Sequence, residues 1–173
     1  MIGAASFLVA GLVRWEDVNS GVNWGVVLLY AAAISLGVQM KDTGAAQWIA
    51  EGFLGLLSSL GADQGIGLWA SVSVLTTAVT NTMSNGAAVA VLGPIVLKLA
   101  VAAGESPIII GFVCAISSSF AYLTVVGTPA CTIVFAAGYL RPSHFLQVGW
   151  RLAIMSTIVL LASAVLYWPL LGV

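Results

Sequence analysis

The amino-acid sequence predicts an all-α membrane protein. Of its 173 residues, 61% are apolar and only 6% are charged, whereas about a quarter of the residues of an ordinary soluble domain carry a charge. The apolar residues form long blocks, and every charged residue lies at or near the end of such a block. Because a charge at the centre of a bilayer is costly, this arrangement is typical of an integral, multi-pass protein of a cell or inner membrane.

Two apolar blocks lie before residue 41. The first, residues 2–13, is shorter than the roughly 20 residues that a span needs. We interpret it as the end of a longer helix and expect the chain to begin within a larger protein. The second block, residues 24–40, is largely apolar and predicts a spanning helix, with Trp24 near one interface.

The next segment, residues 41–63, mixes apolar and polar residues at helical spacing. Its apolar residues recur at steps of three and four, while Lys41, Asp42, Gln47 and Glu51 mark a polar side. This pattern predicts an amphipathic helix that lies along the membrane interface.

Two shorter apolar stretches, residues 65–79 and 87–103, flank a polar sequence that reads Thr80-Asn81-Thr82-Met83-Ser84-Asn85-Gly86. Two arrangements fit this spacing: a surface loop between two tilted spans, or the tip of a re-entrant hairpin within the protein. Non-helical backbone at membrane depth is tolerated only where protein or a wet cavity surrounds it. We predict a re-entrant hairpin over residues 65–103, because both arms are short for independent spans.

A discontinuous helix is predicted over residues 108–139. The apolar run from residue 108 to Val126 meets Gly127-Thr128-Pro129 and then continues from Ala130. Proline removes a backbone donor and glycine is unfavourable inside a helix, so this sequence should interrupt the helix. The final apolar block, residues 145–171, predicts a plain spanning helix.

The sequence does not predict an enzyme or a cofactor. The apolar blocks contain no pair of residues suited to act as acid, base or nucleophile. Cys114 and Cys131 fit core packing better than a disulfide or a metal site, and His144 fits a surface position. No basic cluster indicates a nucleic-acid partner.

The two polar interruptions suit the binding of ions. A broken helix leaves free N–H groups that attract anions and free carbonyls that attract cations. Two facing breaks form the arrangement that secondary transporters use for an anion and its coupling cation. Ser84-Asn85 and Thr128-Pro129 supply both features without a formal charge. The alternative is that they are a simple loop and a kink.

Two motifs resemble a known family. They are Thr80-x-x-Met83-Ser84-Asn85-Gly86-x(7)-Pro94-Ile95 and Gly127-Thr128-Pro129-x-x-x-Ile133-Val134-Phe135-x-x-Gly138-Tyr139-Leu140. Together they resemble the divalent anion:sodium symporter family of the ion transporter superfamily. That family's fold consists of two inverted repeats, each with a re-entrant hairpin and a broken helix, and this chain resembles the second, C-terminal repeat alone. The resemblance implies scaffold-like helices in residues 1–63, a transport-type domain in residues 64–173, a missing N-terminal repeat, and a homodimer of the complete protein.

The resemblance also implies the site residues. In the family, a Ser-Asn-Thr triplet at each hairpin tip contacts the substrate and helps to bind sodium, and the spacing to Pro94 places Ser84-Asn85-Gly86 on this triplet. The substrate-binding residues would then be Ser84, Asn85, Gly86, Thr128 and Pro129. The sodium site would consist of Thr80, Met83, Asn85 and Gly127.

The sequence departs from the family pattern at two places. Gly86 lacks the third hydroxyl of the triplet, and the family's Thr-Pro-Pro-Asn reads Thr128-Pro129-Ala130-Cys131. These departures weaken the expectation of a dicarboxylate substrate. Thr80-Asn81-Thr82 resembles the triplet by residue type but stands four residues too early, so we expect replacement of Asn81 to matter much less than replacement of Asn85.

We therefore expect the C-terminal half of a sodium-coupled secondary transporter of small anions, such as di- or tricarboxylates or sulfate-like anions, with Na⁺ as the coupling ion. Two alternatives stay open. One is a proton-coupled or exporting anion carrier of the same superfamily. The other is a non-transporting membrane fragment, because half of a pseudo-symmetric site cannot close around a substrate.

Overall fold

The computed structural model describes residues 6, 10–11, 14–16, 20, 24–125, 127–138 and 140–171. These residues form seven α-helices and one 3₁₀ helix, with no strand among them, which confirms the predicted all-α class. The chain divides into two compact units, Met1–Ala32 and Ala33–Val173. The helix end predicted at residues 2–13 lies almost entirely outside the described residues, and the features below belong to the second unit.

The helix α3 (Trp24–Asp42) covers the predicted span and continues into the polar residues that follow it. Gly44 separates it from α4 (Ala45–Ser58) and has a φ of 74°. Glycine adopts this left-handed conformation without the steric cost that a side chain would add. The chain can therefore turn sharply at this point.

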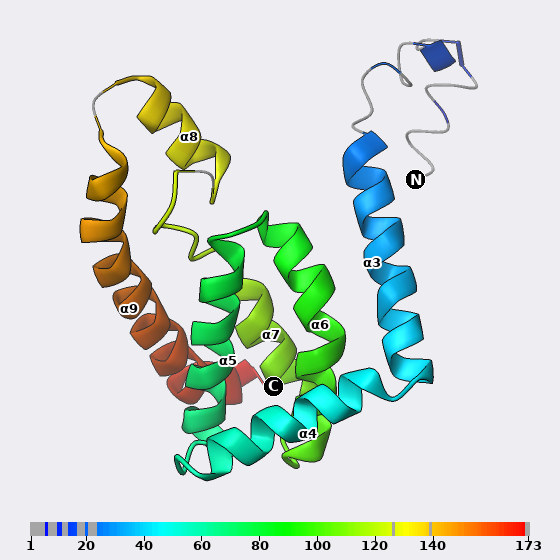
Figure 1. The fold of residues 1–173 in the computed structure, drawn as a ribbon, viewed down its shortest axis with the longest axis vertical. Coiled ribbons are helices and arrows are strands. Elements are labelled where there is room, and N and C mark those ends of the chain that lie inside the picture. Colours follow the sequence, from blue (N-terminus) through cyan, green and yellow to red (C-terminus); the bar gives the residue numbers. More distant parts are fainter. Residues whose placement is uncertain are drawn as a thin grey trace. The chain divides into compact units, whose positions relative to one another are not determined.

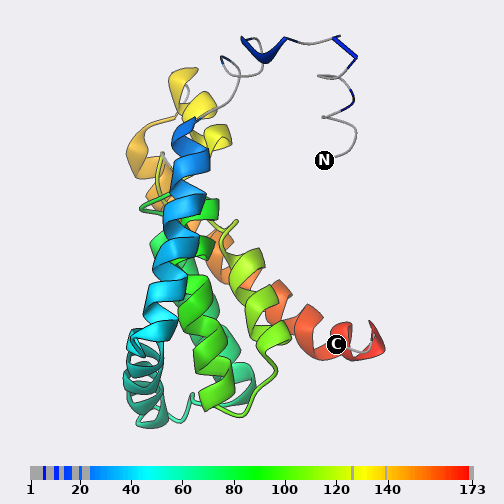
Figure 2. The ribbon, with the colours of Figure 1, turned by 90° about the vertical axis from the view of Figure 1, so that its right-hand side faces the viewer.

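The predicted helix after residue 41 is present as α4, which buries one side. Ala46, Ala50 and Leu57 are buried on the side that packs against α6. By contrast, Trp48 is 78% exposed and Leu56 is 61% exposed. Figures 1 and 2 show α4 lying across the ends of the neighbouring helices. This is the orientation that a helix at a membrane interface needs.

The predicted helical hairpin consists of α5 (Gly65–Thr80) and α6 (Asn85–Ala102), which run antiparallel (Figure 1). Its base is closed by Glu105, whose carboxylate accepts a hydrogen bond of 2.7 Å from Gly65 N. This bond satisfies one of the free N–H groups at the start of α5. Whether the hairpin re-enters the membrane stays a prediction, because α6 is itself long and apolar enough to cross.

A helical interruption within residues 108–139 is confirmed, but it is longer than predicted. The first part, α7 (Pro107–Ser117), ends at Ser117 rather than Val126, and the second part, α8, spans Pro129–Ala136. The prediction of a helix up to Val126 was therefore wrong. The physical reason is that side chains of the hairpin bond to backbone groups between residues 118 and 123, which replaces the hydrogen bonds of a continued helix.

The last helix, α9 (Pro142–Leu166), is followed by the 3₁₀ helix η1 (Trp168–Leu171). Together they match the predicted final span, and Pro142–Leu170 is the second described segment that is long and apolar enough to cross a membrane. A Cβ atom at Gly149 would overlap the backbone carbonyl of Tyr122. Because Gly149 stands about two turns after Pro142, the non-helical segment crosses α9 well inside its length.

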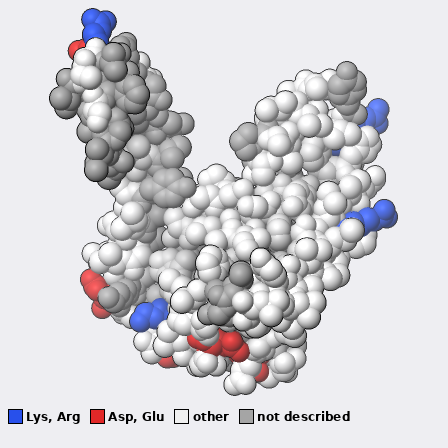
Figure 3. Space-filling model, turned by 180° about the vertical axis from the view of Figure 1, so that it is seen from behind, with Lys and Arg blue, Asp and Glu red and all other residues white. Residues whose placement is uncertain are grey.

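The core of the second unit lies between α5, α6 and α7. Its largest fully buried apolar side chains are Leu68, Val72, Val96, Leu99, Ile110 and Val113. The outer surface is also largely apolar. Figure 3 shows a broad area without charged atoms, and the acidic side chains of the second unit lie at the end where α4 lies. Such a surface suits contact with lipid rather than water.

Candidate site between the hairpin tip and the broken helix

Three oxygen atoms converge at the hairpin tip. The hydroxyl of Thr80, which is fully buried, lies 2.6 Å from the carbonyl oxygen of Ser118 and 3.0 Å from Oδ1 of Asn85. A hydroxyl has one proton, so Thr80 can donate to only one of these acceptors at a time. Uncharged hydroxyl, amide and carbonyl oxygens are the ligands that hard cations prefer. The cluster can therefore hold a small cation.

Asn81 fastens the tip to the segment that follows α7. It is 5% exposed, and its Nδ2 donates to the carbonyl oxygens of Thr77 (2.7 Å) and Phe120 (3.3 Å). Its Oδ1 accepts from Leu123 N at 2.8 Å, and its backbone carbonyl accepts from the hydroxyl of Thr124 at 2.8 Å. Asn81 therefore holds both sides of the non-helical segment against the hairpin.

The next tip residues lead into α6. Met83 and Ser84 are exposed, whereas Asn85 and Gly86 are half-buried. The hydroxyl of Ser84 caps α6 by accepting from Ala87 N at 3.3 Å. Within the described residues, the side chain of Asn85 hydrogen-bonds only through its Oδ1, which leaves the two N–H donors of its amide available to a ligand.

The start of α8 repeats this cap. The hydroxyl of Thr128 accepts from Cys131 N at 3.3 Å, and Pro129 occupies the first turn, where its missing N–H costs no helical hydrogen bond. Gly127 is buried, and a Cβ atom there would lie 2.9 Å from the carbonyl oxygen of Ala121. The close fit of Gly127 explains why the break needs a glycine.

The sequence comparison identifies the family. A family model described as "Sodium:sulfate symporter transmembrane region" matches residues 1–173. The chain belongs to this family. Membership confirms the resemblance to sodium-coupled anion symporters and places the chain in a membrane.

Curated relatives are similar over most of this chain. An uncharacterized transporter of Haemophilus influenzae is 26% identical over 97% of the chain and 36% of its own length. The sodium-dependent dicarboxylate transporter SdcS of Staphylococcus saprophyticus is 29% identical over 94% of the chain and 30% of its own length. The chain thus spans about a third of these relatives. Because the family and these relatives are transporters, transport is favoured over enzymatic activity.

The structure brings some of the family's predicted site residues together and leaves others apart. Thr80 and Asn85 are joined by a hydrogen bond, but no hydrogen bond among the described residues connects either of them with Met83 or Gly127. Thr128 is linked to the tip only indirectly, through the segment that Asn81 holds. In the part of the chain that the structure describes, no hydrogen bond joins the N-terminus of α6 directly to that of α8.

Sequence reasoning missed three features of this region. The family spacing does not indicate that Asn81 forms these hydrogen bonds. The Ser118 carbonyl is a backbone group, so the type of residue at this position does not indicate that it takes part. The third feature lies deeper in the core, where the buried hydroxyls of Ser117 and Ser73 lie 2.7 Å apart and Ser73 lies 3.3 Å from the hydroxyl of Thr157. These bonds join α5, α7 and α9, but isolated hydroxyls in apolar helices have no characteristic spacing.

Proposed function

We propose that the complete protein is a sodium-coupled secondary transporter of small anions, and that this chain supplies half of its binding site. The observation that carries the proposal is the convergence of Thr80 Oγ1, Asn85 Oδ1 and the Ser118 carbonyl. A sodium ion at this position would bind the lone pairs of the three neutral oxygens in place of the hydrogen bonds between them, and the Thr80 hydroxyl would keep its proton. The family's description and the name of SdcS support the same coupling ion.

Sodium coupling is favoured over proton coupling by the chemistry of the cluster. A proton-coupled carrier uses titratable groups inside the membrane. Thr80, Asn81, Asn85 and Ser118 have no side chain that titrates near neutral pH. Among the described residues, no group of three or more His, Cys, Asp or Glu side chains lies close enough together to hold a metal ion, so a site for Na⁺ would be built from neutral oxygens.

The anion would bind between the two capped helix ends. The N-termini of α6 and α8 both carry partial positive charge, and the free amide donors of Asn85 lie at the first of them. A small divalent anion such as sulfate or a short dicarboxylate matches these sparse, uncharged donors. Pro129 and Gly86 would shape the walls of the pocket, with Ser84 and Thr128 near the ligand.

A re-entrant hairpin is part of this proposal. Its support is that the tip is bonded to a non-helical segment that packs against Gly149, about two turns inside α9. Backbone of this kind is tolerated at membrane depth only when protein surrounds it. The division into a scaffold (residues 1–63) and a transport domain (residues 64–173), the first repeat and the homodimer stay predictions from the resemblance.

Uptake into vesicles tests the proposal. The complete protein is reconstituted, and uptake of labelled sulfate and succinate is measured with either sodium or choline outside. Sodium-dependent uptake of one of these anions is expected. Uptake that depends on a pH gradient and does not depend on sodium would favour the proton-coupled alternative. Absence of uptake and of ²²Na⁺ binding would favour a non-transporting fragment.

A further inference from the structure

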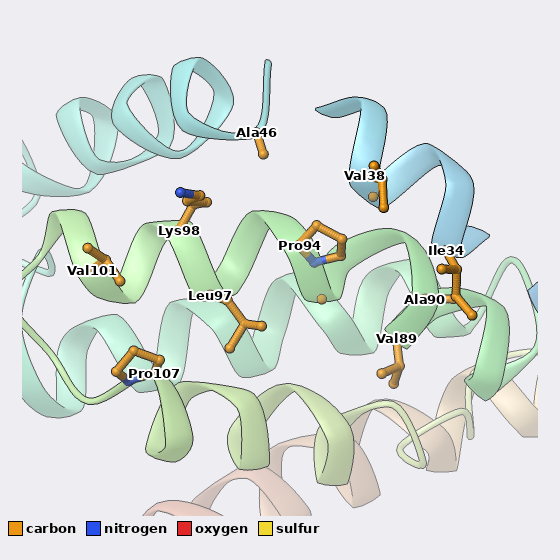
Figure 4. A pocket seen from close by; sticks show the side chains of 12 residues that line it. Ile34, Val38, Ala46, Val89, Ala90, Pro94, Leu97, Lys98, Val101 and Pro107 are labelled. Atoms are coloured by element: carbon orange, nitrogen blue, oxygen red, sulfur yellow. The ribbon is translucent and has the colours of Figure 1, made fainter. Parts of the chain in front are cut away.

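An apolar groove lies along one side of α6, facing the second half of α3 (Figure 4). Its volume is about 610 Å³, within the range of small-molecule sites. Along α6 it extends from Val89 to Val101, or about 18 Å at 1.5 Å per residue. That length is close to half of a hydrocarbon core of about 30 Å. The groove is therefore about as long as one leaflet is deep.

The groove has one cationic end. Of the lining residues that the structure describes, only Lys98 has a polar side chain. Figure 4 shows it between α6 and the start of α4, near Ala46. Lys98 is half-buried and forms no ion pair within the described part of the chain. Two carboxylates of the same region accept hydrogen bonds elsewhere: Glu105 from Gly65 N and Glu51 from Gln47. An ammonium group in such surroundings favours an anionic partner.

The rest of the groove is open to the apolar surface. Ile34 is 68% exposed, Leu97 is 44% exposed and Val101 is 64% exposed, so the walls continue into surface that suits lipid. A molecule could enter sideways from the bilayer, whereas a water-soluble anion would have to pass apolar side chains. Among the described lining residues, none at the end near Val89 and Ala90 has a polar side chain.

We propose that this groove binds an anionic phospholipid of the surrounding membrane. The phosphate contacts Lys98 at the level of α4, and one acyl chain lies along α6 past Pro94. Basic residues between membrane helices at the level of the headgroups are known to bind anionic lipids in this way. The proposal does not depend on the proposed transport function, because none of these residues belongs to the hairpin-tip site.

Two pairs of variants test the groove and its charge. A Cβ atom at Gly93 meets nothing within 4 Å, and Gly93 lines the groove, so Gly93→Leu fills it without a backbone clash. Gly55→Leu is the matched control, because Gly55 on α4 is equally open and does not line the groove. Lys98→Gln removes the charge, and Lys98→Arg keeps it.

The complete protein is purified in detergent and stripped of lipid, and its unfolding temperature is followed as phosphatidylglycerol or phosphatidylcholine is added. Phosphatidylglycerol should raise the midpoint of the wild type, Gly55→Leu and Lys98→Arg at concentrations at which phosphatidylcholine does not. Lys98→Gln should need about fivefold more phosphatidylglycerol for the same rise of the unfolding temperature. Gly93→Leu should show no such rise.

Four outcomes would overturn the proposal. Equal responses to the two lipids would show that the groove does not select an anionic headgroup. An unchanged response in Lys98→Gln would show that Lys98 does not contact the phosphate. No response in the wild type would mean that protein fills the groove. A similar rise of the unfolding temperature with inorganic phosphate alone would mean that Lys98 binds a soluble anion rather than a lipid. If Gly93→Leu does not fold, the comparison of Lys98→Gln with Lys98→Arg decides the matter.

Discussion

Asn81 and Leu123 are 42 positions apart in the sequence, yet Oδ1 of Asn81 accepts a hydrogen bond of 2.8 Å from the backbone N–H of Leu123. This bond joins the hairpin tip to the break in the discontinuous helix. Because Thr80 and Ser118 meet beside it, an ion held by the tip oxygens would also order the segment that leads to Thr128. The bond thus offers a physical route for coupling between cation and anion.

Replacement of Asn81 by alanine should be damaging. It would leave the N–H of Leu123 and the carbonyls of Thr77 and Phe120 without this partner, and an unsatisfied buried polar group costs about 1 to 3 kcal/mol. We expect a lower unfolding temperature in detergent and weaker mutual enhancement of ²²Na⁺ and anion binding. Asn81→Asp keeps the acceptor for Leu123 but turns a second carboxylate oxygen toward the carbonyls of Thr77 and Phe120, so it should be at least as destabilising as Asn81→Ala.

Thr82→Ala is the control for this experiment, because Thr82 is exposed and its hydroxyl bonds only to the Val79 carbonyl one turn earlier. If Asn81→Ala is as mild as Thr82→Ala in both measurements, the proposed coupling through Asn81 is wrong. Family spacing alone favoured that mild result, whereas the hydrogen bonds of the structure favour the damaging one.

Replacement of Asn85 should separate the two ligands. Asn85→Ala removes both the oxygen near Thr80 and the free N–H donors, so sodium and anion binding should both weaken, by about 5- to 150-fold if the two are coupled in the usual range. Asn85→Asp keeps an oxygen for the cation but replaces the donors by a negative charge. It should retain ²²Na⁺ binding and lose binding of labelled sulfate or succinate. If both variants still bind the anion as the wild type does, Asn85 is not part of the site.

The elements of the fold were largely predictable because they follow long apolar blocks and strong breakers. Pro129 marked the start of α8. The helix predicted over residues 41–63 begins later, at Ala45, because α3 continues to Asp42 and the chain turns at Gly44. The end of α7 was not predictable, since residues 120–126 are mostly apolar and carry no local stop signal. Their backbone leaves the helix because Asn81, distant in sequence, bonds to Phe120 and Leu123. Local propensity could not reveal that tertiary competition.

The same limit applies to the candidate site. The family resemblance grouped Thr80 with Asn85, and the two residues are close in sequence because Thr80 ends α5 and Asn85 begins α6. The Ser118 carbonyl is available only because α7 ends there, so its position depends on the same distant contacts. A sequence motif can thus indicate the side chains of an ion site and still miss the backbone groups that complete it.

Gly149→Ala should disturb the site from a distance. A Cβ atom at this position would overlap the backbone carbonyl of Tyr122, and backbone cannot move aside as a flexible side chain can. We expect overpacking to lower stability by about 1 to 3 kcal/mol, measured by thermal unfolding, together with weaker ligand binding. Gly111→Ala is the control, because its nearest neighbour would be the end of the Leu97 side chain at 3.5 Å. Equal effects of the two variants would contradict the close packing of α9 on the break.

The last prediction concerns the membrane depth of the hairpin tip. Single cysteines at Ser84, Asn85 or Gly86, in a background with Cys131→Ser and with Cys114 left in the core, are labelled by a membrane-impermeant thiol reagent. Ser59→Cys reports the membrane side near the end of α4, and Ser143→Cys reports the first turn of α9. A re-entrant tip surrounded by protein should react more slowly than both reference positions and should be protected by sodium with sulfate or succinate. A tip between two complete spans should instead react as fast as Ser143→Cys, without protection by either ligand, and that result would contradict both the re-entrant hairpin and the binding site built on it.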